Sequence, residues 1–274
     1  MPHARLIVLA TALACVVRAG APEYNTLTPA EKAAGWILLF DGHSFNHWRD
    51  PHLLSPPGDA WTIDDACLKA TAHPRITEEL ISQGTYQDFE LQWDWRISPG
   101  GNSGVKYKIQ ALPVLTPGAQ SDRFEDRVNE ALKQHLFDRN AIGATGHAQI
   151  YVVGFEYQMI DNAHHPDAKR GPLYQSSALY GIVPPSYDLT RSVGDFNHSR
   201  LVVRGRHIEH WLNGVKTVDV TLDDDLLKHT LGKRWGVGSP VFHLLADQPK
   251  ANTPISLQNH DDEAWFRNIK IKPL

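Results

Sequence analysis

The chain has 274 residues, enough for one large β domain or two small ones, and we expect a single domain. Apolar residues make up 42% of the sequence, including eight Trp, eight Tyr and nine Phe, so a large buried core can form. The formal net charge of −4 provides no positive field that would attract a polyanion, which argues against nucleic acid as a partner.

The first 21 residues have the pattern of a signal peptide. Arg5 supplies a positive charge, residues 6–17 form an apolar run, and Ala19-Gly20-Ala21 is a small-x-small cleavage site. The apolar run is too short to span a bilayer, and no later segment is apolar enough, so we expect no integral membrane segment after cleavage. We therefore predict a periplasmic or secreted protein, with a lipid anchor on Cys15 as the weaker alternative.

Cys67 is the one cysteine that remains after this cleavage, so we expect no disulfide within the mature chain. It has no adjacent base to activate its thiol. We therefore expect a small buried core side chain rather than a nucleophile.

The first predicted elements are a short helix and two strands. Thr28 can cap a helix that ends near Ala34, with Pro29 in its first turn. Residues 36–40 form the first predicted strand. Residues 91–97 alternate apolar and polar side chains, which is typical of a strand with one buried face.

An amphipathic helix is expected over residues 121–137. Apolar residues recur there at helical spacing: Phe124, Val128, Leu132 and Leu136. Ser121 and Asp122 stand at its start, and Glu125 is spaced for a capping box. We expect this inserted helix to cover one rim of a β-sandwich.

The C-terminal third again alternates like a set of strands. Asn213-Gly214 lies between two alternating segments, residues 208–212 and 215–220, and predicts a two-residue hairpin turn. Residues 265–271 form the last predicted strand. Many antiparallel strands with few helices indicate an all-β sandwich.

Residues 154–162 predict a strand with two different faces. Glu156 and Gln158 share one face, and Phe155, Tyr157 and Met159 share the other. Residues 102–108 and 255–263 have a similar mixed character. Together the three segments predict a polar sheet surface that is backed by the core and is large enough for a carbohydrate.

Several residues are candidates for contacts with a sugar. Aromatic rings stack on the apolar faces of sugars, whereas amides and carboxylates bind hydroxyl groups. The aromatic candidates are Trp48, Tyr180 and Trp211, each with burial in the core as the alternative; the polar candidates are Asn102, Gln158 and His260. Lys106 follows Asn102-Ser103-Gly104, where a small residue lets a ligand approach the backbone, and its ammonium could stabilise an enolate.

Residues 161–167 concentrate histidines and carboxylates. Asp161 and His165 could coordinate a divalent cation, or His165 could act as a general base near neutral pH. The alternative is a polar turn whose side chains make only local hydrogen bonds. No cofactor is predicted with certainty, and a divalent cation is possible.

A conventional retaining glycosidase needs two carboxylates about 5 Å apart, as at strand positions i and i+2. Position i+2 after Glu156 is Gln158, and Asp161 follows at i+5. The ordinary pair is therefore incomplete, which disfavours direct hydrolysis of an unmodified glycoside.

A series of short motifs resembles the 3-keto-disaccharide hydrolase family over residues 36–273. The motifs are Leu39-Phe40-Asp41-Gly42 followed by Trp48, Asp88-Phe89-Glu90-Leu91, Asn102-Ser103-Gly104-Val105, Glu156-Tyr157-Gln158, Ala178-Leu179-Tyr180, His210-Trp211-Leu212-Asn213-Gly214 and Trp265-Phe266-Arg267-Asn268-Ile269. The resemblance implies a concanavalin A-like jelly-roll domain, which we place at residues 35–274. Such a fold hosts lectins and glycoside-cleaving enzymes alike.

The family resemblance implies a glycoside or oligosaccharide substrate already oxidised at C3 by a separate upstream oxidoreductase. A C3 ketone makes the C2 proton acidic, so one base can start β-elimination of the C1 substituent, with hydration afterwards. We assign the base to His165 or a nearby group, enolate stabilisation to Lys106 or a bound cation, and hydroxyl binding or leaving-group protonation to Glu156. Asn102, Gln158, Trp211 and His260 would position the sugar. A lectin-like binding domain and a conventional endoglucanase are the alternatives.

Overall fold

The computed structural model describes residues 24–51, 57–75, 77–115, 123–137 and 149–274. The predicted signal peptide and Cys15 lie outside these residues. None of the helices among the described residues is both long and apolar enough to cross a membrane.

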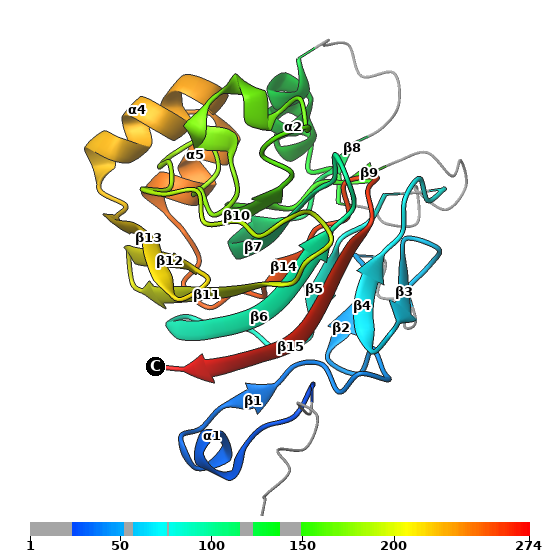
Figure 1. Ribbon diagram of the computed structural model, residues 1–274. Coiled ribbons are helices and arrows are strands. Elements are labelled where there is room, and N and C mark those ends of the chain that lie inside the picture. The colour runs from blue at the N-terminus through cyan, green and yellow to red at the C-terminus, as the bar shows by residue number, and fades with distance from the viewer. Residues whose placement is uncertain (1–23, 52–56, 76, 116–122, 138–148) are drawn as a thin grey trace, which may run out of the picture.

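Two antiparallel sheets and a small ribbon form the molecule (Figure 1). In order, the larger sheet contains β13 (Val215–Thr221), β12 (His207–Leu212), β11 (Asn197–Arg204), β6 (Phe89–Ile97), β15 (Ala264–Pro273), β4 (Cys67–Ala70) and β3 (Trp61–Asp64), with β1 (Ile37–Leu38) paired to β15. The smaller sheet contains β10 (Val153–Ile160), β7 (Asn102–Ala111), β14 (Ser256–Leu257), β5 (Leu80–Ser82) and β2 (Trp48–Arg49). The ribbon pairs β8 (Val114–Leu115) with β9 (Gln149–Ile150).

The predicted all-β jelly-roll sandwich is confirmed, and its core lies between the two sheets. Along β6 the residues alternate strictly between buried and half-buried, as the sequence pattern predicts. Trp93 of β6 packs against Tyr157 of β10, with the ring centroids 5.0 Å apart and the planes nearly perpendicular. The two sheets therefore meet through large aromatic side chains.

Several polar groups within this core are hydrogen-bonded. The Trp95 indole donates to Ser199 Oγ at 2.8 Å, and Ser199 Oγ donates to the Tyr157 hydroxyl at 2.9 Å. His210 is fully buried, with its Nδ1 donating to the Ser177 carbonyl at 3.0 Å and its Nε2 2.9 Å from the Tyr107 hydroxyl. Cys67 is also buried, and burial raises the pKa of its thiol to about 11, as suits a core residue rather than a nucleophile.

The local turn and cap predictions have mixed outcomes. Helix α1 (Pro29–Ala33) begins with the capping box of Thr28 and Glu31. The hairpin at Asn213-Gly214 is confirmed, with φ values of 50° and 88° that suit this dipeptide. Helix α2 (Phe124–Lys133) begins after Arg123 with no side-chain cap, so Glu125 does not take part in the predicted capping box. Ser121 and Asp122, which were expected to open this helix, lie outside the described residues.

Helices cover the smaller sheet more extensively than the sequence analysis predicted. Helices α2, α4 (Asp224–Trp235) and α5 (Pro240–Phe242) lie together beyond β10 and β7, on the side away from β6 and β15 (Figure 1). A π-helical turn (η3, His243–Asp247) continues α5, and two short 3-10 turns (η1, Ala168–Arg170; η2, Pro172–Tyr174) follow β10. Arg234 of α4 and Glu125 of α2 are joined by a 3.1 Å ion pair.

Candidate functional site

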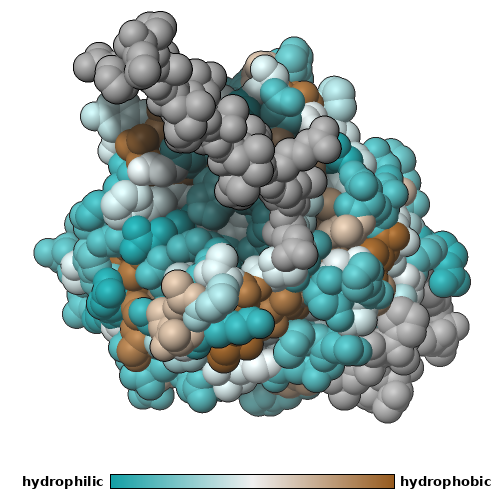
Figure 2. Space-filling view, turned by 60° about the horizontal axis from the view of Figure 1, so that its bottom comes forward, coloured by the Kyte–Doolittle hydropathy of each residue, from teal (hydrophilic) through white to brown (hydrophobic). Residues whose placement is uncertain are grey.

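A polar cavity of about 360 Å³ lies on the face of the smaller sheet that points away from the core. Several separated parts of the chain line it: Thr77 and Glu79; Asn102 and Lys106; Phe124; Ile150, Tyr151, Glu156 and Gln158; Asp167 and Tyr180; Arg234; and Gln258, Asn259, His260 and Asp261. The surface in Figure 2 is mostly hydrophilic, its hydrophobic side chains form small separate patches, and a hollow with hydrophilic walls is visible. Such a polar cavity suits a hydroxyl-rich ligand.

Strand alternation places Glu156 and Gln158 in this cavity. Phe155, Tyr157 and Met159 of the same strand are buried in the core. In the register of β10 and β7, Glu156 lies opposite Lys106 and Gln158 lies opposite Gly104. The predicted division of this strand into a polar and a core face is therefore confirmed.

Gly104 leaves the space that the Glu156 carboxyl group occupies. A Cβ atom at position 104 would lie 2.7 Å from Glu156 Oε1 and 3.1 Å from Glu156 Cγ. Both distances are too short for an ordinary contact with a side chain. The sequence Asn102-Ser103-Gly104 thus provides a close approach, as expected, but for a catalytic candidate rather than for the ligand itself.

Lys106 is a buried cation held by a carboxylate. Its side chain is 3% exposed, and its ammonium forms an ion pair with Glu79, which also accepts a hydrogen bond from the Ser256 hydroxyl. The Tyr151 ring lies 4.9 Å from the ammonium. Burial alone would lower the pKa of Lys106, but Glu79, Tyr151 and Glu156 together raise it above its usual value, so the ammonium stays charged.

Glu156 has the opposite tendency. Burial raises the pKa of its carboxyl group, and nearby Glu79 adds to this effect. Lys106, His260 and Arg234 oppose the rise without cancelling it. The carboxylate of Glu156 therefore binds a proton more tightly than an exposed glutamate does, which is the property of a general base.

His165 lies beside the cavity, and its ring is committed to a local hydrogen bond. The ring centroids of His165 and His260 are 6.5 Å apart, and the exposed His260 is in the cavity lining. His165 Nδ1 accepts a hydrogen bond from the Asp167 backbone N–H at 3.0 Å. Burial lowers the pKa of His165, which favours the neutral ring. Because Nδ1 accepts a hydrogen bond, the neutral ring carries its proton on Nε2 and presents a donor there.

The carboxylate of Asp161 has no free position for a cation. Its Oδ1 accepts from the backbone N–H groups of Ala163 and His164, and its Oδ2 accepts from Gly100 N–H and His164 Nδ1. These four hydrogen bonds use the four lone-pair positions of a carboxylate. Asp161 therefore closes a turn, and the donors of Asp161 and His165 do not suit the divalent cation that the sequence left possible there. Asp161 also does not line the cavity, so it is not the partner carboxylate of Glu156 that an endoglucanase would need.

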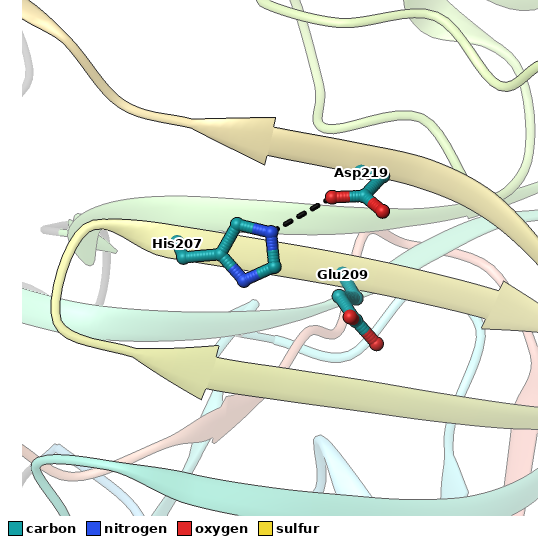
Figure 3. A group of neighbouring side chains, drawn as sticks. All are labelled: His207, Glu209 and Asp219. Atoms are coloured by element: carbon teal, nitrogen blue, oxygen red, sulfur yellow. Dashed lines mark hydrogen bonds and ion pairs between the residues drawn. The ribbon is translucent and has the colours of Figure 1, made fainter.

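Among the described residues, one group of three potential metal ligands lies elsewhere, on β12 and β13: His207, Glu209 and Asp219 (Figure 3). His207 Nε2 is 2.7 Å from Asp219 Oδ1. The Lys216 ammonium lies 2.5 Å from Asp219 and 3.3 Å from Glu209, so it already supplies the positive charge that a cation would bring. This group is accounted for by ion pairs.

The three predicted aromatic residues have different locations. Tyr180 lines the cavity, and its hydroxyl donates to Asp167 Oδ2 at 2.6 Å. Trp48 is fully buried and donates to the Leu39 carbonyl at 2.7 Å, so no ligand can stack on it. Trp211 lies on β12 of the larger sheet, where Arg200 and Lys216 cover its ring, and is not in the cavity. For Trp48 the core alternative holds, because the indole packs in the sandwich.

The sequence analysis did not identify Glu79, Tyr151 or Arg234 as site residues. Arg234 comes from helix α4, which was not predicted, and its guanidinium lies 5.5 Å from the Tyr180 ring. Asp223, which caps α4, and the acidic residues after it were the available signal. Glu79 precedes a strand of three residues, too short to show an alternating pattern.

The two sheets and the polar cavity on the smaller one define a jelly-roll β-sandwich protein with a cavity on one sheet face. The chain belongs to the family described as a 3-keto-alpha-glucoside-1,2-lyase-like domain, whose model matches residues 35–272. It is 30% identical to the 3-keto-disaccharide hydrolase of Bacteroides thetaiotaomicron over 270 residues, which cover 93% of this chain and 83% of that protein.

Solved structures support the same fold. A candidate glycosyl hydrolase from Parabacteroides distasonis superposes with a TM-score of 0.67 at 23% identity, covering 92% of this chain and all of that one. A second from the same organism gives a TM-score of 0.56 at 24% identity, covering 87% and 99% of the two chains. At these identities the comparison establishes the fold alone.

Proposed function

We propose that this protein cleaves glycosides whose sugar ring carries a ketone at C3, by removing the C2 proton and expelling the C1 substituent. Family membership supports the substrate class. The observation that carries the mechanism is the pairing of Glu156, a carboxyl group with a raised pKa, with the buried ammonium of Lys106 across two neighbouring strands. One group can accept a proton while the other stabilises the negative charge that results.

The proposed reaction has two stages. Glu156 takes the C2 proton, the C2–H electron pair forms a C2=C3 double bond, and the negative charge moves to the C3 oxygen near Lys106. The enolate then reforms the C3 ketone, a C1=C2 double bond forms, and the C1–O bond breaks as the leaving oxygen takes the proton held by Glu156. Water adds its oxygen to C1 and a proton to C2, so the sum of the two stages is hydrolysis.

Glu156 replaces His165 as our proposed base. The Nδ1 lone pair of His165 is used by the Asp167 N–H, so its free nitrogen is a donor in the neutral ring. A donor at the cavity rim suits a sugar hydroxyl or ketone oxygen, and we assign His165 and His260 to that role. Lys106 takes the electrostatic role without a bound cation, because Asp161 has no free lone pair.

Export and an upstream enzyme complete the proposal. The predicted signal peptide places the reaction in the periplasm or outside the cell. Because the chain acts on a ring that is already a ketone, an oxidoreductase must first oxidise the C3 hydroxyl of the glycoside. This protein would then cleave the resulting 3-keto glycoside.

The test uses purified protein with a 3-keto glucoside and with the same glucoside unoxidised. We expect release of the aglycone from the keto form only. In deuterated water, the wild-type protein should catalyse exchange of the C2 hydrogen of a 3-keto sugar without a leaving group for deuterium. The Glu156→Gln variant should not catalyse this exchange. Equal cleavage of both glucosides would overturn the elimination scheme, and tight binding of the keto glucoside with no turnover would assign the protein to passive sugar binding.

A further inference from the structure

Three buried side-chain amides in the cavity have unused hydrogen-bonding capacity. Asn102 Oδ1, Gln158 Oε1 and Nε2, and Gln258 Oε1 have no hydrogen-bond partner among the described residues. Asn102, Gln158 and Gln258 are 3%, 1% and 7% exposed. Buried polar atoms without a partner are uncommon in folded proteins, and several in one polar cavity indicate a missing ligand or ordered water.

Two of these amides flank a glycine. Gln158 on β10 lies opposite Gly104 on β7, and Gln258, just after β14, donates its backbone N–H to the Gly104 carbonyl at 2.9 Å on the other side. Gly104 contributes no side chain between them. The two amides therefore face a gap in the sheet surface, into which the Glu156 carboxyl group also extends.

Two other buried amides of this chain are fully hydrogen-bonded. Gln110, on the same strand as Gly104, is 2% exposed, and its Nε2 donates to the carbonyls of Lys108 and Lys250 while its Oε1 accepts from Lys250 N–H. Asn259, adjacent to Gln258, also uses both ends of its amide. Buried amides in this chain can thus be fully satisfied, whereas Asn102, Gln158 and Gln258 keep unpartnered atoms in the cavity.

We propose that Gln158 and Gln258, with Asn102, form a clamp that recognises free hydroxyl groups of the reacting sugar ring, and that Gln258 is a specificity-determining residue. This inference rests on the proposed function and names its substrate more closely, as a keto-hexopyranoside with unsubstituted ring hydroxyls. Each amide offers both donors and acceptors, which matches hydroxyl groups. A ring without the matching hydroxyl leaves a buried amide unpaired and is rejected strongly.

The test compares a 3-keto glucoside with its 4-deoxy and 6-deoxy forms. For the wild-type protein we expect kcat/KM to fall about 100-fold or more with at least one deoxy form, because the site would hydrogen-bond the missing hydroxyl. Gln258→Met and Gln158→Met, close in size to glutamine, should lower kcat/KM on the parent sugar about 10-fold. On the deoxy sugar that lacks the hydroxyl bound by the replaced glutamine, the variant's kcat/KM should differ from the wild-type value by about 3-fold or less.

Gln110→Met is the matched control, since it replaces a buried amide that is already satisfied. It should lower the thermal midpoint and leave the ratio of parent to deoxy kcat/KM unchanged. Gln158→Met and Gln258→Met should lose discrimination without a comparable loss of thermal stability.

Wild-type protein that cleaves all three keto sugars equally, or variants that keep full discrimination, would overturn the clamp while leaving the proposed function in place. Failure of the wild-type protein to cleave any keto glucoside would instead overturn the proposed function. In that case calorimetric titration of the same three sugars still decides whether the amides recognise hydroxyl groups.

Discussion

Glu156 and Lys106 face each other across β10 and β7, and both side chains enter the same polar cavity. Their protonation tendencies are opposed in a useful way. Burial makes the carboxyl group hold a proton more tightly, whereas Glu79 keeps the ammonium charged. The cavity thus combines a proton acceptor with a fixed positive charge.

Replacing Glu156 by glutamine should abolish keto-glycoside cleavage while preserving the fold. Loss of a general base typically costs about 100-fold to 10,000-fold in rate. For the wild-type enzyme, kcat/KM should fall on the acidic side as Glu156 becomes protonated, at a pH above the usual glutamate range because its pKa is raised. The measurement is kcat/KM as a function of pH. If Glu156→Gln kept the wild-type rate and the same fall at acidic pH, the assignment would be contradicted.

The Glu156→Gln substitution should also increase folding stability at alkaline pH. The raised pKa of Glu156 means that the folded state binds the proton more tightly than the unfolded chain. Its contribution to stability is therefore full below about pH 4.3 and is lost as the pH rises through the folded pKa. Glu156→Gln should be more stable than wild type at pH 8 and indistinguishable at pH 3.5, as measured by urea unfolding.

Removing the Lys106 ammonium should reduce turnover by about 100-fold or more, as for other groups that stabilise developing charge. Lys106→Met alone also leaves Glu79 buried without its partner, which costs about 3–5 kcal/mol of stability. The double variant Lys106→Met with Glu79→Gln should regain much of that stability and remain inactive. Recovery of both stability and activity in the double variant would show that Lys106 is only structural.

A methyl group at Gly104 should disturb the site more than the fold. The added Cβ would meet Glu156 Oε1 at 2.7 Å, so the carboxyl group must move. We expect Gly104→Ala to lower kcat about 10-fold or more, since misplacement of a catalytic group is costly. Gly58→Ala is the control, because a Cβ there meets no atom of the described residues within 4 Å and activity should not change.

His210 should account for part of the loss of folding stability at acidic pH. Burial lowers its pKa to about 4, while an unfolded histidine titrates near pH 6.5. The stability from its neutral form is present above about pH 6.5 and is lost as the pH falls through 4, a contribution of up to about 3 kcal/mol. Urea unfolding of wild type should show this decline between pH 6.5 and pH 4.

Two variants isolate the His210 contribution. In His210→Gln the decline across that pH range should be shallower, although the variant is less stable at pH 7 because two buried hydrogen bonds are changed. The exposed His43→Gln should follow the wild-type curve. A His210→Gln curve parallel to wild type would remove this histidine as the source.

Much of the fold followed from local patterns in the sequence. The alternation along β6 and β10 and the Asn213-Gly214 turn each depend on residues close together in the chain, so they could be predicted. The start of α2 could not, because Arg123 begins this helix without a side-chain cap, and the packing of α2 against α4 and α5 is a tertiary effect.

The candidate site was predictable where strand faces decide it. Lys106, Glu156 and Gln158 follow from alternation, and each lies in the cavity. Trp48 and Trp211 show the limit of this reasoning, because an aromatic residue in a strand has the same local signal whether it faces the core, the solvent or a ligand. Arg234 and Glu79 reach the cavity only through packing between distant segments.

One hydrogen bond in the cavity wall joins Thr77 Oγ1 to Asp261 Oδ1 at 2.5 Å, between residues 184 positions apart in the chain. Contacts of such high sequence separation form slowly in refolding chains. Enzymatic turnover should therefore be among the last properties regained after dilution from denaturant, later than the far-ultraviolet circular dichroism of the strands.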